Sequence, residues 1–159
     1  MTILSNRHLW KYSEFIENKK YSFNKDKILN CLTKDNIDEA YLNISKWENY
    51  IPTPLVELNK LSEKLNLNKI FYKDESKRFN LKSFKALGGA YAVERVSNGN
   101  NKIVVATATA GNHGRSVAWG AKRLGLECKI FISENVTEAR GKAMSDLGAE
   151  VIKVKGNYE

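Results

Sequence analysis

Apolar and polar positions alternate in blocks along the second half of the chain, and the period changes from one block to the next. Short apolar runs are typical of buried strands, and apolar side chains spaced three or four residues apart are typical of helices. The pattern predicts strands at 103–107, 128–132 and 150–154, and helices at 112–124 and 137–147. Strands that alternate with helices predict an α/β fold with a parallel sheet, flanking helices and right-handed crossovers.

Each predicted helix of this half is followed by a glycine, Gly125 or Gly148, at the position where a helix commonly ends. We expect matching inward faces, made of Val117, Ala121 and Leu124 in one helix and of Ala139, Ala143 and Leu147 in the other. Ligands of parallel sheets bind at the carboxyl ends of the strands. The turn after residue 107 is therefore the first place where we expect a site.

The first half of the chain carries weaker signals. The two prolines of residues 52–54 predict an extended segment, because proline fixes φ and disfavours helix in the residue before it. Leucines with helical spacing predict a helix near 58–65, and residues 70–72 are typical of a short buried strand. We expect an N-terminal helical or irregular segment over residues 1–50 and an α/β part over residues 51–159.

Charge narrows the possible partners. The 159 residues include 26 basic and 18 acidic side chains, a net charge of +8. The basic residues form no stripe, aromatic residues do not interleave with them, and no nucleic-acid motif is present. We therefore expect no nucleic-acid partner, and we attribute the charge to an anionic cofactor or substrate.

No apolar run of 18 residues exists, and residues 1–10 lack the apolar core of a signal peptide, so we expect a cytoplasmic chain without membrane contact. The two cysteines, Cys31 and Cys128, lie in unrelated contexts, and no C-x-x-C pattern or His/Cys cluster is present. We expect both thiols to be reduced and partly buried, and we expect no metal site.

The stretch from Lys73 to Tyr91 runs from a strand end through a polar turn into a helix whose first turn carries Lys85. A helix N-terminus and an apolar neighbour disfavour an ammonium charge, and a neutral amine is a nucleophile. Gly88 and Gly89 follow one turn later, where each glycine costs about 1 kcal/mol in a helix interior. We expect another group to approach that backbone closely.

A second stretch, T-A-T-A-G-N-H-G at residues 107–114, connects a predicted strand to a predicted helix. Glycine-containing turns of this kind present free backbone N–H groups that bind a carboxylate or a phosphate. The stretch is neither G-x-G-x-x-G nor a P-loop, which disfavours dinucleotide and nucleoside-triphosphate sites.

Together, S-F-K at residues 83–85 and T-A-T-A-G-N-H-G resemble the signature segments of fold type II pyridoxal-phosphate enzymes, the tryptophan synthase β-like group. Within that group, Y-K-D-E-S-K-R-F, F-K-A-L-G-G-A-Y-A and A-G-N-H-G-R-S-V-A-W-G-A are similar to diaminopropionate ammonia-lyase. The similarity extends from P-T-P-L at residue 52 to residue 158. The resemblance implies a lyase of amino-acid catabolism that eliminates ammonia from 2,3-diaminopropionate, acts on a small amino acid and forms a homodimer when complete.

The resemblance also implies roles for individual residues. Lys85 matches the lysine that holds pyridoxal 5'-phosphate covalently and removes the substrate α-proton, which suits a group used as nucleophile and then base. Phe84 matches the residue beside the cofactor ring, although a core aromatic is an equal alternative. Asn112 matches the asparagine that donates a hydrogen bond to the cofactor's phenolic oxygen, with an ordinary helix cap as its alternative.

The segment before Asn112 matches the loop that binds the substrate α-carboxylate. Thr109, Gly111 and His113 fall in this loop, where we expect backbone N–H groups to matter more than the imidazole. For His113, a structural role is an alternative to general-acid chemistry. The family-like charged residues of the turn 74–78 are expected to form a solvated or salt-bridged turn without a catalytic role.

Two departures from the family pattern bear on the substrate. Ala110 stands where diaminopropionate ammonia-lyases carry an aspartate regarded as the base on the opposite face of the cofactor. Residues 80–85 read N-L-K-S-F-K instead of G-L-N-A-F-K, closer to threonine and serine dehydratases. Family members are more than twice as long and carry a phosphate-binding glycine loop later in the chain, so we expect this truncated chain to be the front part of an enzyme and inactive alone.

Two alternatives to a diaminopropionate ammonia-lyase stay open. One is a threonine or serine dehydratase, which uses the same signature segments. The other is a non-catalytic fragment that binds an anion at residues 109–112, or a decayed product without activity. A borohydride-stable cofactor adduct on Lys85 separates the enzymes from the anion-binding fragment.

Overall fold

The computed structural model describes residues 24–156, except the side chains of Lys25 and Cys31. The predictions for residues 1–23 and for the thiol of Cys31 lie outside the described part. The described chain divides into two compact units. One consists of residues 24–39 with Leu55–Lys73, and the other of Ala40–Pro54 with residues 74–156.

The first unit contains short elements with little burial. Helix α1 (Lys25–Cys31) begins after Asn24, whose side chain accepts a hydrogen bond from the Lys27 N–H at 3.0 Å. Helix α2 (Lys34–Ile44) starts in this unit and has no buried residue. Apolar side chains along both helices, Ile28 and Ile37 among them, are about half exposed.

Strands β1 (Leu55–Glu57) and β2 (Phe71–Lys73) form an antiparallel pair, connected through helix α3 (Asn59–Leu65). The predicted helix near 58–65 is confirmed. A strand near 70–72 is also present, but its predicted burial is wrong, because Phe71 and Tyr72 are each 52% exposed. A two-stranded ribbon covers neither of its own faces.

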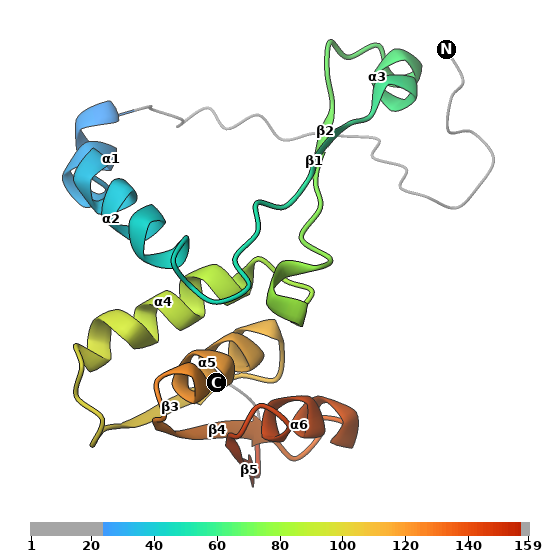
Figure 1. Ribbon diagram of the computed structural model, residues 1–159. Helices are drawn as coiled ribbons and strands as arrows, with labels where there is room; N and C mark the ends of the chain where they lie inside the picture. The colour runs from blue at the N-terminus through green and yellow to red at the C-terminus, as the bar shows by residue number, and fades with distance from the viewer. Residues whose placement is uncertain (1–23, 157–159) are drawn as a thin grey trace. The chain divides into compact units, whose positions relative to one another are not determined.

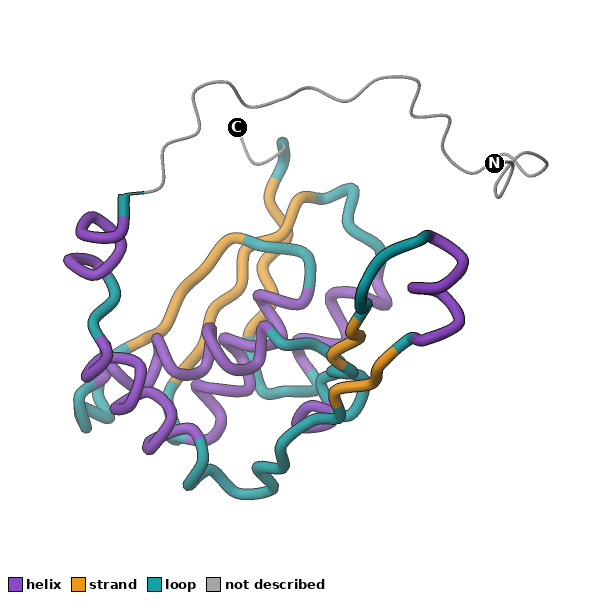
Figure 2. The backbone as a smooth tube through the Cα atoms, turned by 90° about the horizontal axis from the view of Figure 1, so that it is seen from above, coloured by secondary structure: helices purple, strands orange, loops and turns teal. Residues whose placement is uncertain are grey.

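The second unit contains the predicted alternation of strands and helices (Figures 1 and 2). In chain order, it comprises the 3-10 turn η1 (Arg78–Asn80), α4 (Lys85–Ser97), β3 (Val104–Ala108), α5 (Asn112–Arg123), β4 (Glu127–Ser133), α6 (Glu138–Ser145) and β5 (Glu150–Val154). The strands form a parallel sheet in the order β3-β4-β5. The predicted α/β fold is confirmed. Gly125 and Gly148 have φ of 66° and 91°, as a left-handed helix end requires.

The core lies on the face of the sheet that α5 and α6 cover. Cys128, Ile130 and Ile132 alternate along β4 and are at most 2% exposed, and they cluster with Ala121 of α5 and Met144 of α6. Val117 and Ala121 of the predicted inward faces are buried. Ala139 is exposed, so its predicted inward position is wrong: α6 presents Gly141 and Met144, three residues apart, to the sheet.

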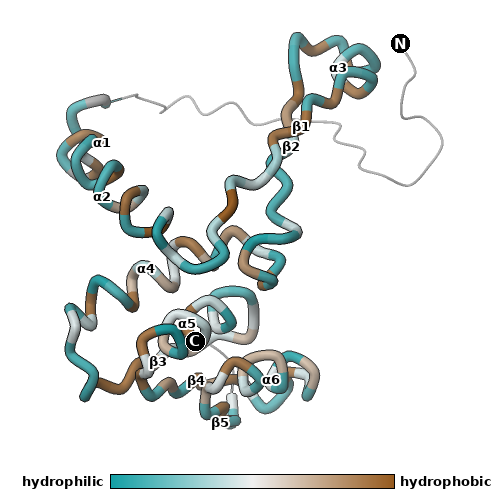
Figure 3. The backbone as a smooth tube through the Cα atoms, in the orientation of Figure 1, coloured by the Kyte–Doolittle hydropathy of each residue, from teal (hydrophilic) through white to brown (hydrophobic). Residues whose placement is uncertain are grey.

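The opposite face of the sheet is more open. Lys129 and Phe131 of β4 point to that face and are half-buried. The Lys129 ammonium lies 3.3 Å from the carboxylates of both Glu150 and Glu127, and their hydrogen bonds raise its pKa. Hydrophobic stretches run along β3 and β4 (Figure 3).

Candidate functional site

Lys85 is the first residue of α4, as its place in the lysine-containing stretch predicts. Its backbone N–H donates to the hydroxyl of Ser83 at 3.2 Å, and Ser83 is only 8% exposed. The Lys85 ammonium lies 5.1 Å from the centroid of the Phe84 ring. Both side chains are exposed, with Phe84 at 60%, so the apolar neighbour does not bury the lysine, and the alternative of Phe84 as a core aromatic is wrong.

The start of α5 presents backbone N–H groups to its surroundings. Gly111 precedes the helix with an extended backbone, and no side chain accepts a hydrogen bond at this cap position in the described structure. Asn112 is the first helical residue and is exposed, so its interpretation as an ordinary helix cap is wrong. The Thr109 N–H donates to the Phe131 carbonyl at 3.1 Å, which fixes the preceding loop against β4.

Helices α4 and α5 pack almost backbone to backbone. A Cβ atom added to Gly89 would lie 2.8 Å from Ser116 Cβ and closer still to the Ser116 hydroxyl. A Cβ atom added to Gly120 would lie 2.7 Å from Ala90 Cα. The expectation of a close approach is therefore confirmed at Gly89, whereas a Cβ atom added to Gly88 would meet no described atom of another element within 4 Å.

Ser116 also connects the two helices through a hydrogen bond. Its side chain is fully buried, and its hydroxyl donates to the backbone carbonyl of Lys85. Lys85, at the start of α4, contacts Ser116 of α5, and Ala90, later in α4, lies beside Gly120, later in α5. The two helices therefore run in the same direction, with their N-termini at the same end. The structure thus brings Lys85 near the first turn of α5, which carries Asn112. Sequence patterns identified Gly89 but not its partner Ser116.

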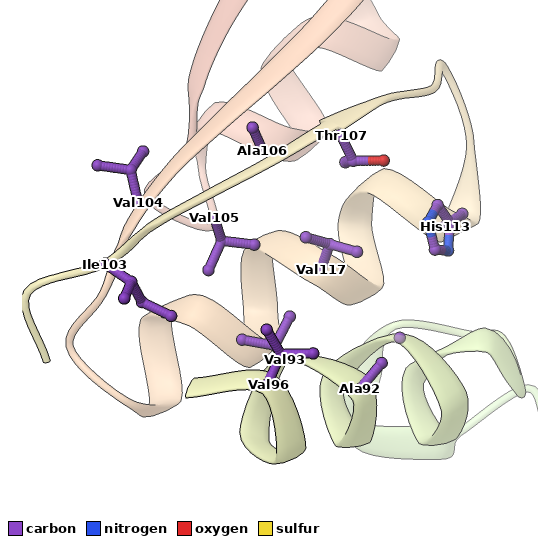
Figure 4. A pocket seen from close by; sticks show the side chains of 11 residues that line it. Ala92, Val93, Val96, Ile103, Val104, Val105, Ala106, Thr107, His113 and Val117 are labelled. Carbon is purple, nitrogen blue, oxygen red and sulfur yellow. The ribbon is translucent and has the colours of Figure 1, made fainter. Parts of the chain in front are cut away.

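An apolar cleft of about 320 Å³ lies between α4, β3 and α5. Val93, Val105 and Val117 line its interior (Figure 4). Thr107 and His113 lie at the end where β3 passes into α5, and His113 is exposed. This arrangement places the imidazole at the rim of the cleft, beside the uncapped helix start.

A family model described as "Pyridoxal-phosphate dependent enzyme" matches residues 46–159, most of the chain. The chain belongs to this family. Its parallel sheet, flanked by helices, is the fold of the fold type II, tryptophan synthase β-like members.

Known pyridoxal-phosphate enzymes similar to the chain have related activities. Diaminopropionate ammonia-lyase of Escherichia coli (strain K12) is 41% identical over 128 residues, which cover 69% of this chain and 32% of that protein. Biosynthetic L-threonine dehydratase of Pasteurella multocida is 39% identical over 108 residues, covering 67% of this chain and 20% of that protein. The chain therefore spans about a third or less of the length of these relatives.

A solved structure agrees with the sequence comparison. The Escherichia coli diaminopropionate ammonia-lyase, in complex with an aminoacrylate-PLP azomethine reaction intermediate, superposes with a TM-score of 0.80 at 35% identity. The match covers 90% of this chain and 39% of that one. The structural likeness therefore includes nearly all of the pyridoxal-phosphate enzyme fold present here.

The turn before Lys85 is salt-bridged, as predicted. Arg78 is 5% exposed and forms an ion pair with Glu75 at 2.7 Å, and that carboxylate raises the pKa of the arginine. Asp74 accepts a hydrogen bond from the Ser76 N–H at 2.9 Å, and bonds from Ser76 lower the pKa of Asp74.

Residues 24–156 contain neither a metal-binding cluster nor a membrane-spanning helix. No group of three histidine, cysteine, aspartate or glutamate side chains there is arranged to hold a metal ion. None of the helices in this range combines the length and the apolar composition needed to cross a membrane.

Proposed function

We infer that the complete protein is a pyridoxal-phosphate-dependent lyase that eliminates ammonia from 2,3-diaminopropionate. One diaminopropionate and one water give one pyruvate and two molecules of ammonia. The observation that carries this inference is the shared end of α4 and α5. The exposed Lys85 begins α4, Ser116 of α5 donates a hydrogen bond to its backbone carbonyl, and the start of α5 has no side-chain cap. The 41% identity to a diaminopropionate ammonia-lyase supports the choice of substrate.

The residues at this end fit the cofactor. The exposed Lys85 amine is accessible for a covalent bond to its aldehyde carbon, and the exposed Asn112 amide has donors for its phenolic oxygen. Phe84, exposed beside Lys85, provides an apolar surface for one side of the ring. When bound, pyridoxal phosphate supplies an electron sink for the carbon that loses its proton.

With the cofactor bound, Lys85 would have a second role after the substrate amine had displaced its own. Its neutral amine would accept the substrate α-proton, because a neutral lysine is a competent base. The resulting ammonium would then donate a proton to the β-amino group, which would leave as ammonia, and water would release the second ammonia to give pyruvate.

The start of α5 binds the substrate α-carboxylate in this proposal. The N–H groups that follow Gly111 and the positive end of the helix dipole both favour an anion. The Thr109 hydroxyl adds one donor, and His113 at the rim of the cleft adds a further polar group. The uncapped helix start supports this assignment, because its backbone donors are not used by a side chain.

The organisation of the whole protein is part of the proposal. Residues 51–159 form the incomplete N-terminal part of the enzyme domain, preceded by a separate segment over residues 1–50. The complete enzyme is a cytoplasmic homodimer with a small amino acid as its substrate and with no nucleic-acid partner. The match of the family model to residues 46–159 supports the position of this boundary.

A threonine or serine dehydratase is the second candidate, and the 39% identity to a threonine dehydratase supports it. A chimera separates the two. Residues 46–159 replace the matching segment of the Escherichia coli diaminopropionate ammonia-lyase, and pyruvate or 2-oxobutyrate release is measured with diaminopropionate, serine and threonine. We expect diaminopropionate to have the highest kcat/KM, and a preference for threonine or serine would assign the dehydratase instead.

The role of Lys85 is tested in the 159-residue chain itself. Pyridoxal phosphate is added, borohydride fixes the adduct, and peptides are mapped. We expect Lys85 to be labelled in preference to other lysines, and Lys85→Ala to remove this label. Lys122→Ala is the matched control, because it removes an exposed amine from the last turn of α5, outside the segment that leads to Lys85. Saturable anion binding without label on Lys85 would support a non-catalytic fragment.

A further inference from the structure

Arg78 is buried beside the turn that leads to Lys85, and its guanidinium group is unusually well bonded. It donates to both carboxylate oxygens of Glu75, at 2.7 and 3.0 Å, in a bidentate pair. It also donates to the Ile51 carbonyl at 3.0 Å and to the Thr53 hydroxyl at 2.9 Å. The Thr53 hydroxyl in turn donates to Glu75. One side chain thus ties residues 51–53 to the turn before α4.

The segment after Arg78 contains residues in strained backbone conformations. Phe79, Asn80 and Lys82 have φ of 45°, 58° and 56°, in the left-handed region that bulky side chains rarely adopt. Such conformations persist only where the surroundings over-determine them, and they gather at functional sites.

The side chains of Phe79 and Leu81 also hold this segment. The Phe79 ring centroid lies 4.6 Å from that of Trp119 in α5 and 5.8 Å from that of Trp47. The Leu81 N–H donates to the Arg78 carbonyl at 2.8 Å, and the Leu81 side chain is 4% exposed. Four residues after Leu81 the chain reaches Lys85, so the path of residues 79–84 sets where the lysine amine lies.

We propose that Arg78 is a positioning residue for Lys85, acting through the left-handed segment 79–82. The inference rests on the proposed function, because it assumes that the place of the Lys85 amine matters for reaction with the cofactor. Lysine cannot substitute for arginine here, since an ammonium lacks the planar fork that reaches Glu75, Ile51 and Thr53 together. A displacement of about 1 Å is enough to lower the rate of a positioned reaction by up to about 10².

The test compares adduct formation at Lys85 with that at Lys122, an exposed lysine in the last turn of α5. Pyridoxal phosphate and borohydride are applied to the 159-residue chain, and the ratio of the two labels is measured by peptide mapping. If a lysine reacts only because it is exposed, its labelling does not change when Arg78 is replaced. We expect Arg78→Lys to lower the Lys85:Lys122 ratio roughly tenfold, within the range that such a displacement allows.

Two controls keep the result interpretable. Arg140→Lys makes the same exchange at an exposed arginine of α6, and it should leave the ratio unchanged. Thr53→Val removes one acceptor of the Arg78 network with little change of volume, and it should lower the ratio by a smaller factor.

Hydrogen exchange gives a second, independent measurement. Exchange of residues 79–87 should accelerate in Arg78→Lys, while exchange in α6 should not.

The outcomes distinguish this inference from the proposed function. An unchanged ratio and unchanged exchange in Arg78→Lys, or in Thr53→Val if the former does not fold, would overturn the role of Arg78 alone. Equal labelling of Lys85 and Lys122 in the unmodified chain would overturn the proposed function together with this inference. A lowered ratio with selective exchange at residues 79–87 supports both.

Discussion

Cys128 shows how burial of one ionisable side chain makes stability depend on pH. The thiol lies in the core at 2% exposure, and burial raises its pKa. The neutral thiol is therefore favoured in the folded state more than in the unfolded chain. Its contribution to stability is complete below the unfolded pKa of about 8.5 and is lost as pH rises through the folded pKa.

We expect the free energy of unfolding of the chain to fall more steeply above about pH 8.5 than that of Cys128→Ala. The reason is that the thiol loses its proton at a lower pH in the unfolded chain than in the folded one. Between those two pH values the free energy of unfolding falls by up to about 1.4 kcal/mol per pH unit. Urea unfolding between pH 7 and 10 measures the difference, and both chains share every other titrating group. Parallel pH profiles for the two chains would show that Cys128 is not responsible.

At the residue scale, sequence patterns pointed to the candidates Lys85 and Asn112 but not to Ser116 and Arg78, for a physical reason. Lys85 and Asn112 lie in contiguous motifs, so their environment is encoded by close neighbours in the chain. Ser116 and Arg78 act through partners up to 31 residues away, at Lys85 O and at Ile51 O. Local periodicity does not report such long-range bonds. Only the costly Gly89 in a helix interior pointed to a partner.

At the scale of elements, the packing of α4 on α5 depends on which glycine faces the partner helix. Gly89→Ala should destabilise the fold by about 1–3 kcal/mol, because the new methyl overlaps Ser116. Gly88→Ala, one residue away, should instead stabilise by up to about 1 kcal/mol, since its Cβ meets no described atom within 4 Å. Urea unfolding of both variants at neutral pH measures these opposite signs.

A second substitution tests whether Ser116 is the cause. Ser116→Gly removes the overlapping side chain, so Gly89→Ala should cost less in the Ser116→Gly background than in the unmodified chain. The difference between the two costs is the coupling energy of the pair. Equal costs in both backgrounds would place the strain elsewhere in α4.

The elements from β3 to β5 were predicted within two residues, because each strand or helix there has its own period and a glycine or polar turn at its end. The first unit was predicted less well. Its strand near 70–72 is apolar in composition yet exposed, and residue pattern alone does not reveal whether another layer covers a strand. The left-handed residues 79, 80 and 82 were also missed, because no glycine marks them.

At the scale of the whole molecule, Ala110 is one of the two places where the sequence departs from the diaminopropionate ammonia-lyase pattern. It is half-buried in the loop between β3 and α5, directly before Gly111. The resemblance described above implies an aspartate at this position, as a base for the face of the cofactor opposite the lysine. A methyl group accepts no proton, so under the proposed function this loop supplies no base to that face and Lys85 serves only its own.

The expected consequence is a strong preference for one stereoisomer. In the chimera carrying residues 46–159, kcat/KM for L-diaminopropionate should exceed that for the D-isomer by a factor on the order of 10² or more, the usual worth of a positioned base. Ala110→Asp should raise turnover of the D-isomer and leave the L-isomer comparatively unchanged, because Lys85 still serves its own face. Pyruvate release from each isomer measures both effects. Comparable rates for the two isomers in the chimera with Ala110 would mean that a base on the opposite face comes from another part of the enzyme.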